Sequence, residues 1–383
     1  MLRKHLMTAL VATPLIAALA ACGSSSQADD ANSAGGPANL AAAQTVVDEA
    51  TTLPDTITQT KPLTKAPPKG VKLAYLNCEA PGCAPSGVAV EKAGKALGWD
   101  VSVITAKSAT PGAALQQAID AGNEYIVLNS FNLSAVGPQM KQAKDKGITV
   151  IGTFMLEKPT GKDGNGLSAV FYNDESPHFA GRDFADWMIV HSKGAANVLM
   201  VNVPILPSNS ISAKATEDEL KKNCPACEYA SLDVSFDQMA SGAVPGAIVS
   251  HLKTHPKTNY VYFYFADLAT GVIPALKTGG LQDKVTLVGN SQAAPQLQSM
   301  VDGTSAAWSA VPLTVAWSAM DYAARASAGE PPTEEELKQS QAIRVPIIDD
   351  PKVARQILDS PTQGVWEGPT GYEDQYTKLW NVG

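Results

Sequence analysis

Short apolar runs alternate with longer helical stretches along most of this chain, and this alternation restricts its fold more than any other feature. From residue 71 the apolar runs are 71–77, 100–105, 125–129 and 148–154, and the predicted helices between them are 86–97, 111–121 and 134–145. Runs of five to seven residues have the length of buried strands. The alternation therefore predicts βαβ units, which build a parallel sheet covered by helices.

The same alternation begins again at residue 168. Its apolar runs are 168–172, 197–202, 228–234, 260–265, 285–290 and 343–349, and its helices are 177–191, 213–223, one ending near His255, 267–278 and 312–328. Two successive sheets predict two lobes, and open parallel sheets bind ligands beyond the carboxyl ends of their strands. We therefore expect an α/β fold with two doubly wound parallel-sheet lobes and a ligand cleft between them.

The N-terminal segment has the pattern of an export signal. Arg3 and Lys4 precede the apolar stretch 6–21, which is short for a membrane span. The residues that follow, 23–39, are rich in Gly, Ser, Ala, Asn and Asp, and such a composition buries too little apolar surface to fold. Residues 1–21 are therefore predicted to be a signal peptide.

Cys22 lies between these two segments, in "LAACGSSS". Residues 19–22 resemble the bacterial lipobox, in which the cysteine is lipidated and becomes the mature N-terminus; a plain signal peptide or a free cysteine is the alternative. Residues 22–69 are then expected to be a lipidated tether and an extended, proline-rich lead-in. Acyl chains give durable anchoring, so we expect the protein outside the cytoplasmic membrane, held by lipid at the cell surface or in the periplasm.

The composition is that of a globular protein and excludes several functions. The chain has 383 residues, of which 45% are hydrophobic and 17% charged, and this length allows two domains after the tether. The net charge is −8 and no basic tract occurs, so nucleic acid is not an expected partner. No G-x-S-x-G, H-E-x-x-H or P-loop pattern occurs, and we expect neither an enzyme nor a bound cofactor or metal.

Four cysteines remain besides Cys22, and an even number in an exported chain suggests disulfides. Their close spacing favours the pairs Cys78–Cys83 and Cys224–Cys227. The second pair, in "CPAC", also permits a thioredoxin-like redox role, but it follows a charged stretch and not a strand. A four-cysteine zinc site is disfavoured because the two pairs are far apart in the sequence.

Three segments resemble one known family. They are "GKALGWDVSVITAKSATPGAALQQAIDAGNEYIVLNSFNLSAV" (94–136), "QAKDKGITVIGTF" (142–154) and "ADLATGVIPALKTGG" followed by "VTLVGN" (266–290). In order and spacing they resemble the type I periplasmic binding proteins, specifically the ribose-like sugar binders of ABC importers. The resemblance covers roughly residues 70–350.

This resemblance implies how the chain divides between the lobes. Lobe one is expected at 70–172 plus 311–343, and lobe two together with a C-terminal extension at 173–310 plus 344–383. The last part, 351–383, runs past the usual end of the family. It contains two Trp and two Tyr in "VWEGPTGYEDQYTKLW", so we expect this C-terminal extension to pack on a lobe.

The resemblance also implies where a ligand would bind. The candidate ligand-binding residues are Glu79, Asn129, Phe131, Phe154, Asn209, Ser212, Phe236, Asp267, Asn290 and Trp308. Phe236 and Trp308 are the expected ring walls, and Asn129 and Asp267 the expected polar contacts. The alternatives are a solvated loop position for Glu79 and core packing for Phe154 and Trp308.

At several positions where members of the family hydrogen-bond sugar hydroxyls, this chain lacks the charged or amide side chain. Ser212 stands near the family's Arg, and Asn290 with Ser291 replaces Phe-Asp. Each charge-assisted hydrogen bond lost would weaken sugar binding by about 1.5–3 kcal/mol. The resemblance implies a small organic ligand that is a sugar or sugar-like molecule, and these losses make a less polar or aromatic compound the alternative.

The expected function is that of an extracytoplasmic solute-binding lipoprotein of an ABC importer. It would act as a monomer, capture its ligand by lobe closure and deliver it to a membrane permease. A ligand-sensing receptor for a membrane signalling partner has the same fold and is the alternative. An exported enzyme or a CxxC redox protein is a weaker alternative.

Overall fold

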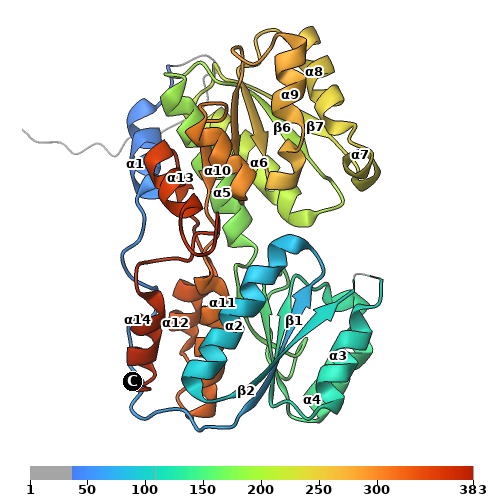
Figure 1. Cartoon of the computed structure of the whole chain (residues 1–383), viewed down its shortest axis with the longest axis vertical. Helices are drawn as coiled ribbons and strands as arrows, with labels where there is room; N and C mark the ends of the chain where they lie inside the picture. The colour runs from blue at the N-terminus through green and yellow to red at the C-terminus, as the bar shows by residue number, and fades with distance from the viewer. Residues whose placement is uncertain (1–36, 108, 383) are drawn as a thin grey trace, which may run out of the picture. The chain divides into compact units, whose positions relative to one another are not determined.

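The computed structural model describes residues 37–107 and 109–382. In this part of the chain the strands form two separate sheets, each with helices packed on both of its faces (Figure 1). The predicted signal peptide, Cys22 and the first part of the predicted tether lie outside the described residues.

The first sheet has five parallel strands in the order β2-β1-β3-β4-β5. The strands are β1 (Lys72–Cys78), β2 (Asp100–Ala106), β3 (Tyr125–Asn129), β4 (Thr149–Thr153) and β5 (Leu167–Phe171). Every residue of β3 is buried, as expected for a central strand covered on both faces. The structure confirms the predicted parallel sheet, and β5, the first run of the second series, completes it.

Helices cover both faces of this sheet. They are α2 (Ala84–Leu97), α3 (Pro111–Asp120), α4 (Gly137–Asp145), α11 (Thr314–Ser327) and α12 (Glu334–Gln341). Alternate strand residues point to opposite faces: Val127 belongs to the core that α2 and α11 cover, and Ile126 to the core that α3 and α4 cover. This is the doubly wound arrangement that the alternation predicted.

The second sheet has six strands in the order β11-β10-β9-β8-β6-β7. They are β6 (Asn197–Asn202), β7 (Glu228–Asp233), β8 (Tyr260–Phe263), β9 (Thr286–Gly289), β10 (Ala307–Ser309) and β11 (Ile347–Ile348). All neighbours are parallel except β11, which pairs antiparallel with β10. The predicted strand 343–349 therefore exists, but it is shorter and runs against the rest of its sheet.

Helices also cover both faces of the second sheet. They are α1 (Leu40–Thr51), α5 (Glu175–His191), α6 (Pro207–Asn223), α7 (Phe236–Ala240), α8 (Val244–Thr254), α9 (Val272–Gly279), α10 (Ala294–Val301) and α13 (Pro351–Leu358). Residues of α1, α5 and α6 form one core, and residues of α8, α9, α10 and α13 form the other.

The predicted extended lead-in needs a correction. Residues 40–51 form α1, which begins at the side-chain cap of Asn39 and packs along α5 (Figure 1). Its buried residues, Ala43, Val47 and Ala50, recur with helical spacing and join the core of the second lobe. Small residues hide this helix in the sequence because they resemble the composition of the preceding tether.

The C-terminal extension packs on both lobes. Residues 351–358 pack on the second lobe as α13, but α14 (Tyr372–Leu379) joins the core of the first lobe. Trp380 is completely buried and stacks on Trp317 of α11, with ring centroids 5.4 Å apart. The expected packing of this extension on a lobe is confirmed, but the extension divides between the two.

Candidate functional site

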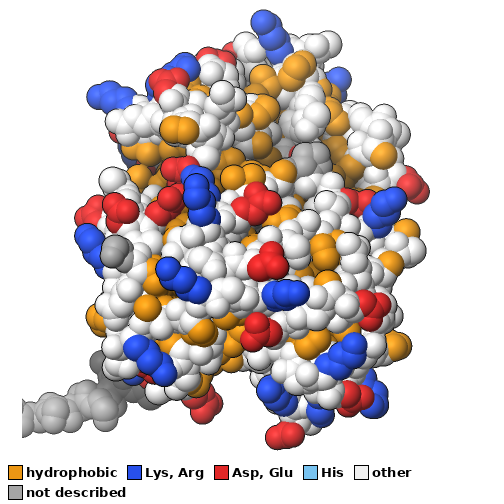
Figure 2. All heavy atoms as spheres, turned by 60° about the horizontal axis from the view of Figure 1, so that its bottom comes forward, with side chains coloured by type: hydrophobic (Ala, Val, Ile, Leu, Met, Phe, Trp, Pro, Cys, Tyr) orange, Lys and Arg blue, Asp and Glu red, His pale blue; other side chains and the backbone are white. Residues whose placement is uncertain are grey.

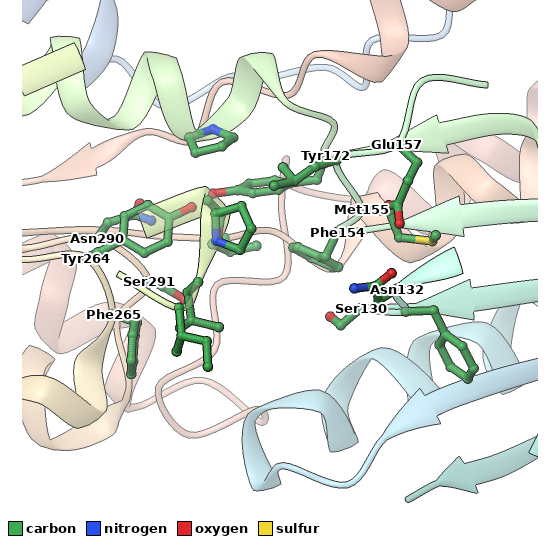
Figure 3. Close-up of a pocket in the computed structure, with 18 residues that line it drawn as sticks. Ser130, Asn132, Phe154, Met155, Glu157, Tyr172, Tyr264, Phe265, Asn290 and Ser291 are labelled. Atoms are coloured by element: carbon green, nitrogen blue, oxygen red, sulfur yellow. The ribbon is translucent and has the colours of Figure 1, made fainter. Parts of the chain in front are cut away.

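A cavity of about 640 Å³ is lined by residues that follow strands of both sheets (Figure 3). In the first lobe the lining comes from the ends of β3, β4 and β5, and in the second lobe from the segments after β6, β8 and β9. The carboxyl ends of parallel strands are the usual ligand-binding edge of such sheets. The predicted cleft therefore exists, and both lobes contribute to its walls.

Four residues of this lining have positive φ although they are not glycine. They are Ser130, Phe154, Tyr172 and Ser291, with φ of 61°, 54°, 61° and 60°. The first three come directly after β3, β4 and β5, and Ser291 lies two residues after β9. A non-glycine residue in this region costs on the order of 1 kcal/mol, and such strain concentrates at functional sites.

Aromatic rings from both lobes face this cavity. Phe154 and Tyr172 belong to the first lobe, and their ring centroids lie 4.8 Å apart. Tyr264 and Phe265 follow β8 in the second lobe, and the hydroxyls of Tyr172 and Tyr264 point toward one another (Figure 3). We call this cavity the ring chamber.

The two tyrosine hydroxyls of the ring chamber stay protonated. Burial raises the pKa of Tyr172, and hydrogen bonding from Asn290 and Tyr264 offsets only part of this effect. Burial also holds the pKa of Tyr264 well above its usual value. Both groups can therefore donate hydrogen bonds but cannot neutralise a positive charge.

Electrostatics restricts the ligands that the ring chamber can hold. Among its described lining residues Glu157 is the one charged side chain, and neither Lys nor Arg is present. Glu157 Oε1 accepts a hydrogen bond from the Leu133 backbone N–H at 2.9 Å, which fixes the carboxylate at the chamber wall. An anionic ligand would meet a negative charge without a compensating cation, so this chamber suits uncharged or cationic ligands.

A second cavity of about 630 Å³ adjoins the ring chamber. The two share the lining residues Ser130, Phe154, Phe265, Ser291 and Val311. Two loops line much of the second cavity: the one closed by the Cys78–Cys83 disulfide, and the C-terminal loop 360–367. We call this second cavity the loop chamber.

Five predicted site residues line one or both of these chambers. Phe131 and Asn290 line the ring chamber, Asn129 and Asp267 line the loop chamber, and Phe154 lines both. Asn129 is nearly buried; its Nδ2 donates to Asn77 Oδ1 at 2.8 Å, and its Oδ1 accepts from Thr153 and Ser130 at 3.3 Å. These bonds fix its amide at the cavity edge.

The two expected ring walls, Phe236 and Trp308, lie elsewhere. Phe236 is 49% exposed at the start of α7, where the Ser235–Gln238 capping box turns the chain into a helix, and it lines neither chamber. Trp308 is 1% exposed and stacks on Phe263 with ring centroids 6.0 Å apart. Its neighbours in β10 alternate between the faces of a covered strand, so Trp308 points into the core.

Three further predicted residues are also outside both chambers. Asn209 Oδ1 accepts a hydrogen bond from the Val203 backbone N–H, and Ser212 Oγ lies 3.2 Å from the Tyr262 hydroxyl. Both side chains are fully buried at the start of α6, where they hold the helix to its sheet. Glu79 is exposed within the disulfide loop and is not a lining residue.

Sequence reasoning missed Tyr172, Tyr264 and Phe265, which supply three of the aromatic rings that line the ring chamber. Tyr172 and Phe265 stand at the last positions of the predicted strands 168–172 and 260–265, and Tyr264 directly precedes Phe265. Such aromatic residues read as core, because a run of apolar residues does not mark where a strand ends. A signal was available, since residues at the carboxyl ends of parallel strands are the ones that meet ligands.

Both predicted disulfides are present, Cys78–Cys83 and Cys224–Cys227. The first closes the loop after β1, and Asn77 Nδ2 donates to the Cys83 carbonyl at 2.9 Å, so the loop is attached to the polar side chains at the cavity edge. The second closes the turn between α6 and β7, away from both chambers.

The family model of the periplasmic binding protein domain matches residues 80–331. This match covers well over half of the chain, and the chain belongs to the periplasmic binding protein family. Similar solved structures confirm the two-lobed fold that the resemblance to type I periplasmic binding proteins implied. Membership of this family agrees with the expectation that the chain is not an enzyme. A search of curated protein sequences found no match.

Three similar structures illustrate the range of that fold. GanP, a glucose-galactose binding protein from Geobacillus stearothermophilus, is 18% identical with a TM-score of 0.61, covering 77% of this chain and 100% of its own. A periplasmic ribose ABC transporter protein from Conexibacter woesei is 18% identical with a TM-score of 0.62, covering 78% and 97%. A 5-methylthioribose transporter solute binding protein from Thermotoga lettingae is 16% identical with a TM-score of 0.61, covering 83% and 99%.

Two surface properties bear on the other expected partners. On the face drawn in Figure 2, basic and acidic side chains are interspersed, and no broad basic patch is visible there. Within residues 37–107 and 109–382, no helix combines the length and the apolar character that a membrane span requires.

Proposed function

We propose that this protein is the extracytoplasmic solute-binding lipoprotein of an ABC importer. The family and the two-lobed fold support a solute-binding role. The lipobox-like residues 19–22 support a lipid anchor at Cys22, which would keep the protein close to a membrane permease. Closure of the lobes on a ligand would present the surface that the permease recognises.

The ring chamber is the proposed ligand site. The observation that carries this proposal is the group of four rings, Phe154, Tyr172, Tyr264 and Phe265, at a cavity with a single charged side chain. Burial of apolar surface against a ring contributes a binding free energy of about 25 cal/mol per Å². Rings pack best against a flat or apolar face, such as a sugar face or an aromatic ring. We therefore propose a small organic ligand, uncharged or cationic, that stacks between rings of the two lobes.

The test is a search for a bound ligand in the purified protein, followed by a binding screen. Native mass spectrometry should find a small molecule that leaves on mild denaturation. A thermal-shift screen of sugars, polyols, aromatic acids and nucleosides should give hits that raise Tm with increasing concentration, because a ligand of the folded state stabilises it. Aromatic acids should rank last because of Glu157. The absence of both a co-purified molecule and any hit would overturn the proposal.

A further inference from the structure

The loop chamber has walls that are built from parts of the chain outside the ring chamber. Ala80, Gly82 and Cys83 of the disulfide loop form one part of its lining. Gln363, Gly364 and Val365 of the C-terminal loop form another. These last residues lie beyond the segment 80–331 that the family model matches, so this wall belongs to the chain's own C-terminal extension.

The C-terminal loop is held in place by several contacts. Thr362 Oγ1 donates to the Val365 carbonyl at 2.7 Å, and the Leu313 N–H donates to the Glu367 carbonyl at 3.2 Å. Gly364 has φ of 103°, and a Cβ at this position would lie 2.8 Å from Ala294. Glycine is thus required here both for its conformation and for the close approach to α10. The loop is a fixed wall of the chamber.

The two chambers differ in chemistry. Five aromatic residues line the ring chamber, whereas the described lining of the loop chamber has only the two that both chambers share, Phe154 and Phe265; hydroxyl, amide and carboxylate groups line both chambers. The polar residues that line the loop chamber and not the ring chamber are Ser86, Asn129, Asp267, Gln292 and Gln363. Among the described lining residues of both chambers no Lys or Arg occurs, and the charged ones are Glu157 and Asp267. Hydroxyl and amide groups of a ligand would find hydrogen-bond partners in the loop chamber but not an anion's counter-charge.

The chambers are also too large together for a single sugar ring. Each has a volume near 630–640 Å³, and each alone lies within the range of about 300–1,000 Å³ that is usual for a drug-sized ligand. Phe154 and Phe265 stand at the junction and face both chambers. A ligand that passes between these two rings reaches both sets of groups.

We propose that the ligand has two parts and occupies both chambers. Its planar or apolar ring lies in the ring chamber, and a hydroxyl- or amide-bearing part joined to it lies in the loop chamber, with no anionic group on either. Nucleosides and aryl glycosides have this chemistry. This inference rests on the proposed function, because it takes the ring chamber as the ligand site.

Calorimetry with joined compounds and their separate halves tests the proposal. The joined probes are adenosine, thymidine and phenyl glucoside; the halves are adenine, thymine, phenol, ribose, deoxyribose and glucose. At least one joined probe should bind about 10-fold or more tightly than either of its halves, because one binding event then uses both chambers. Adenosine monophosphate should bind at least about 10-fold more weakly than adenosine, because its phosphate meets Asp267 or Glu157 without a cation.

A variant that fills only the loop chamber provides the second measurement. Ala293 is exposed, precedes α10 and lines the loop chamber, so Ala293→Trp should remove the preference for the joined probe while its planar half binds as before. The matched control is Ala243→Trp, because Ala243 is likewise exposed and precedes α8 but lines neither chamber. The control should keep the full preference.

The outcomes separate this inference from the proposed function. If sugars or other halves bind as tightly as every joined probe, or if Ala293→Trp leaves the preference unchanged, the two-part ligand is wrong and solute binding stands. If none of the joined probes, halves or simple sugars binds and no molecule co-purifies, the proposed function itself is wrong.

Discussion

Individual side chains at the strand ends shape the ligand site. Ser130, Phe154 and Tyr172 each follow a strand of the first sheet in a left-handed conformation. This conformation turns the chain sharply at the sheet edge, so these residues end their strands and line the cavity. The packed sheet behind these residues supports the strain, which is on the order of 1 kcal/mol for each.

Phe154 and Phe236 form a matched pair for testing the ring chamber. Phe154→Ala removes a ring that lines both chambers, and the affinity for the best hit of the ligand screen should fall about 10-fold. Phe236→Ala removes an exposed ring that lines neither chamber, and affinity should stay within about two-fold. Isothermal calorimetry measures both. Equal losses in the two variants, or a loss only in Phe236→Ala, would show that the chamber is wrongly assigned.

Asp186 makes the stability of the second lobe depend on pH. Its side chain is buried between α5 and α6; Oδ1 accepts from Asn223 Nδ2 at 2.9 Å, and Oδ2 has no hydrogen-bond partner within residues 37–107 and 109–382. Burial raises the pKa of Asp186 to about 6 from an ordinary 3.8, and Asn223 offsets only part of this effect. Ionisation of Asp186 therefore costs folding free energy.

For a carboxyl group with a raised folded-state pKa, stability is greatest when the group is protonated. The contribution of Asp186 is fully present below about pH 4 and is lost as the pH rises through about 6. Asp186→Asn should therefore raise the free energy of unfolding by about 1–2 kcal/mol at pH 7.5 relative to the parent, and by little at pH 4. Urea unfolding at both pH values measures this. A difference between the two proteins that is the same at both pH values would contradict the prediction.

At the scale of elements, two segments at the ends of the described chain hold each other. The Ile57 N–H donates to Gln375 Oε1 at 3.0 Å, and the Leu63 N–H donates to the Leu379 carbonyl at 2.8 Å. Ile57 and Leu63 belong to the connection from α1 in the second lobe to β1 in the first. Gln375 and Leu379 belong to α14, which packs on the first lobe, whereas the preceding helix α13 packs on the second. Each lobe is thus attached to the other by connections beyond those of the central family fold.

Trp380 is the residue on which the docking of α14 depends most. Its ring stacks on Trp317, and its Nε1 donates to Asp321 Oδ1 at 2.8 Å, while Asp321 also accepts from Arg325 at 2.7 Å. Trp380→Ala leaves a cavity and removes one bond to a buried carboxylate, so the free energy of unfolding should fall by about 3–5 kcal/mol. Lys378→Ala, at an exposed position of the same helix, is the control and should change it by less than about 0.5 kcal/mol. Similar values for the two variants in denaturant unfolding would contradict the assigned packing.

At the scale of the whole molecule, function depends on export and anchoring as well as on the cleft. Cys22→Ala should release the protein from the membrane or leave an unprocessed precursor, because the acyl chains are attached at this residue in the proposed lipoprotein. Membrane fractionation with immunoblotting distinguishes precursor, processed and released forms. Ser24→Ala, in the same segment, is the control and should stay with the membrane. A processed Cys22→Ala protein that remains on the membrane would overturn the anchor.

The sequence by itself determined the two-sheet α/β architecture, the disulfide pairs and the family. Strand runs such as 125–129 and 260–265 are apolar because both faces of their sheets are covered, so the sequence of these runs predicts their burial. The two disulfides could be predicted from the spacing of the cysteines, because residues three or five apart in the sequence are close together in most folds.

Only the tertiary structure decided which rings meet the cleft. Tyr172 and Phe265 look like strand residues and Phe236 looks like a ligand contact, because local sequence does not show where a strand stops or which way the following turn directs a side chain. The packing of α1 and the division of the C-terminal extension were equally hidden. Those positions depend on contacts between residues far apart in the chain, such as Trp380 with Trp317 and Leu63 with Leu379. The sequence pattern predicts that a residue will be buried, but which residues it contacts depends on how the helices and strands pack in three dimensions.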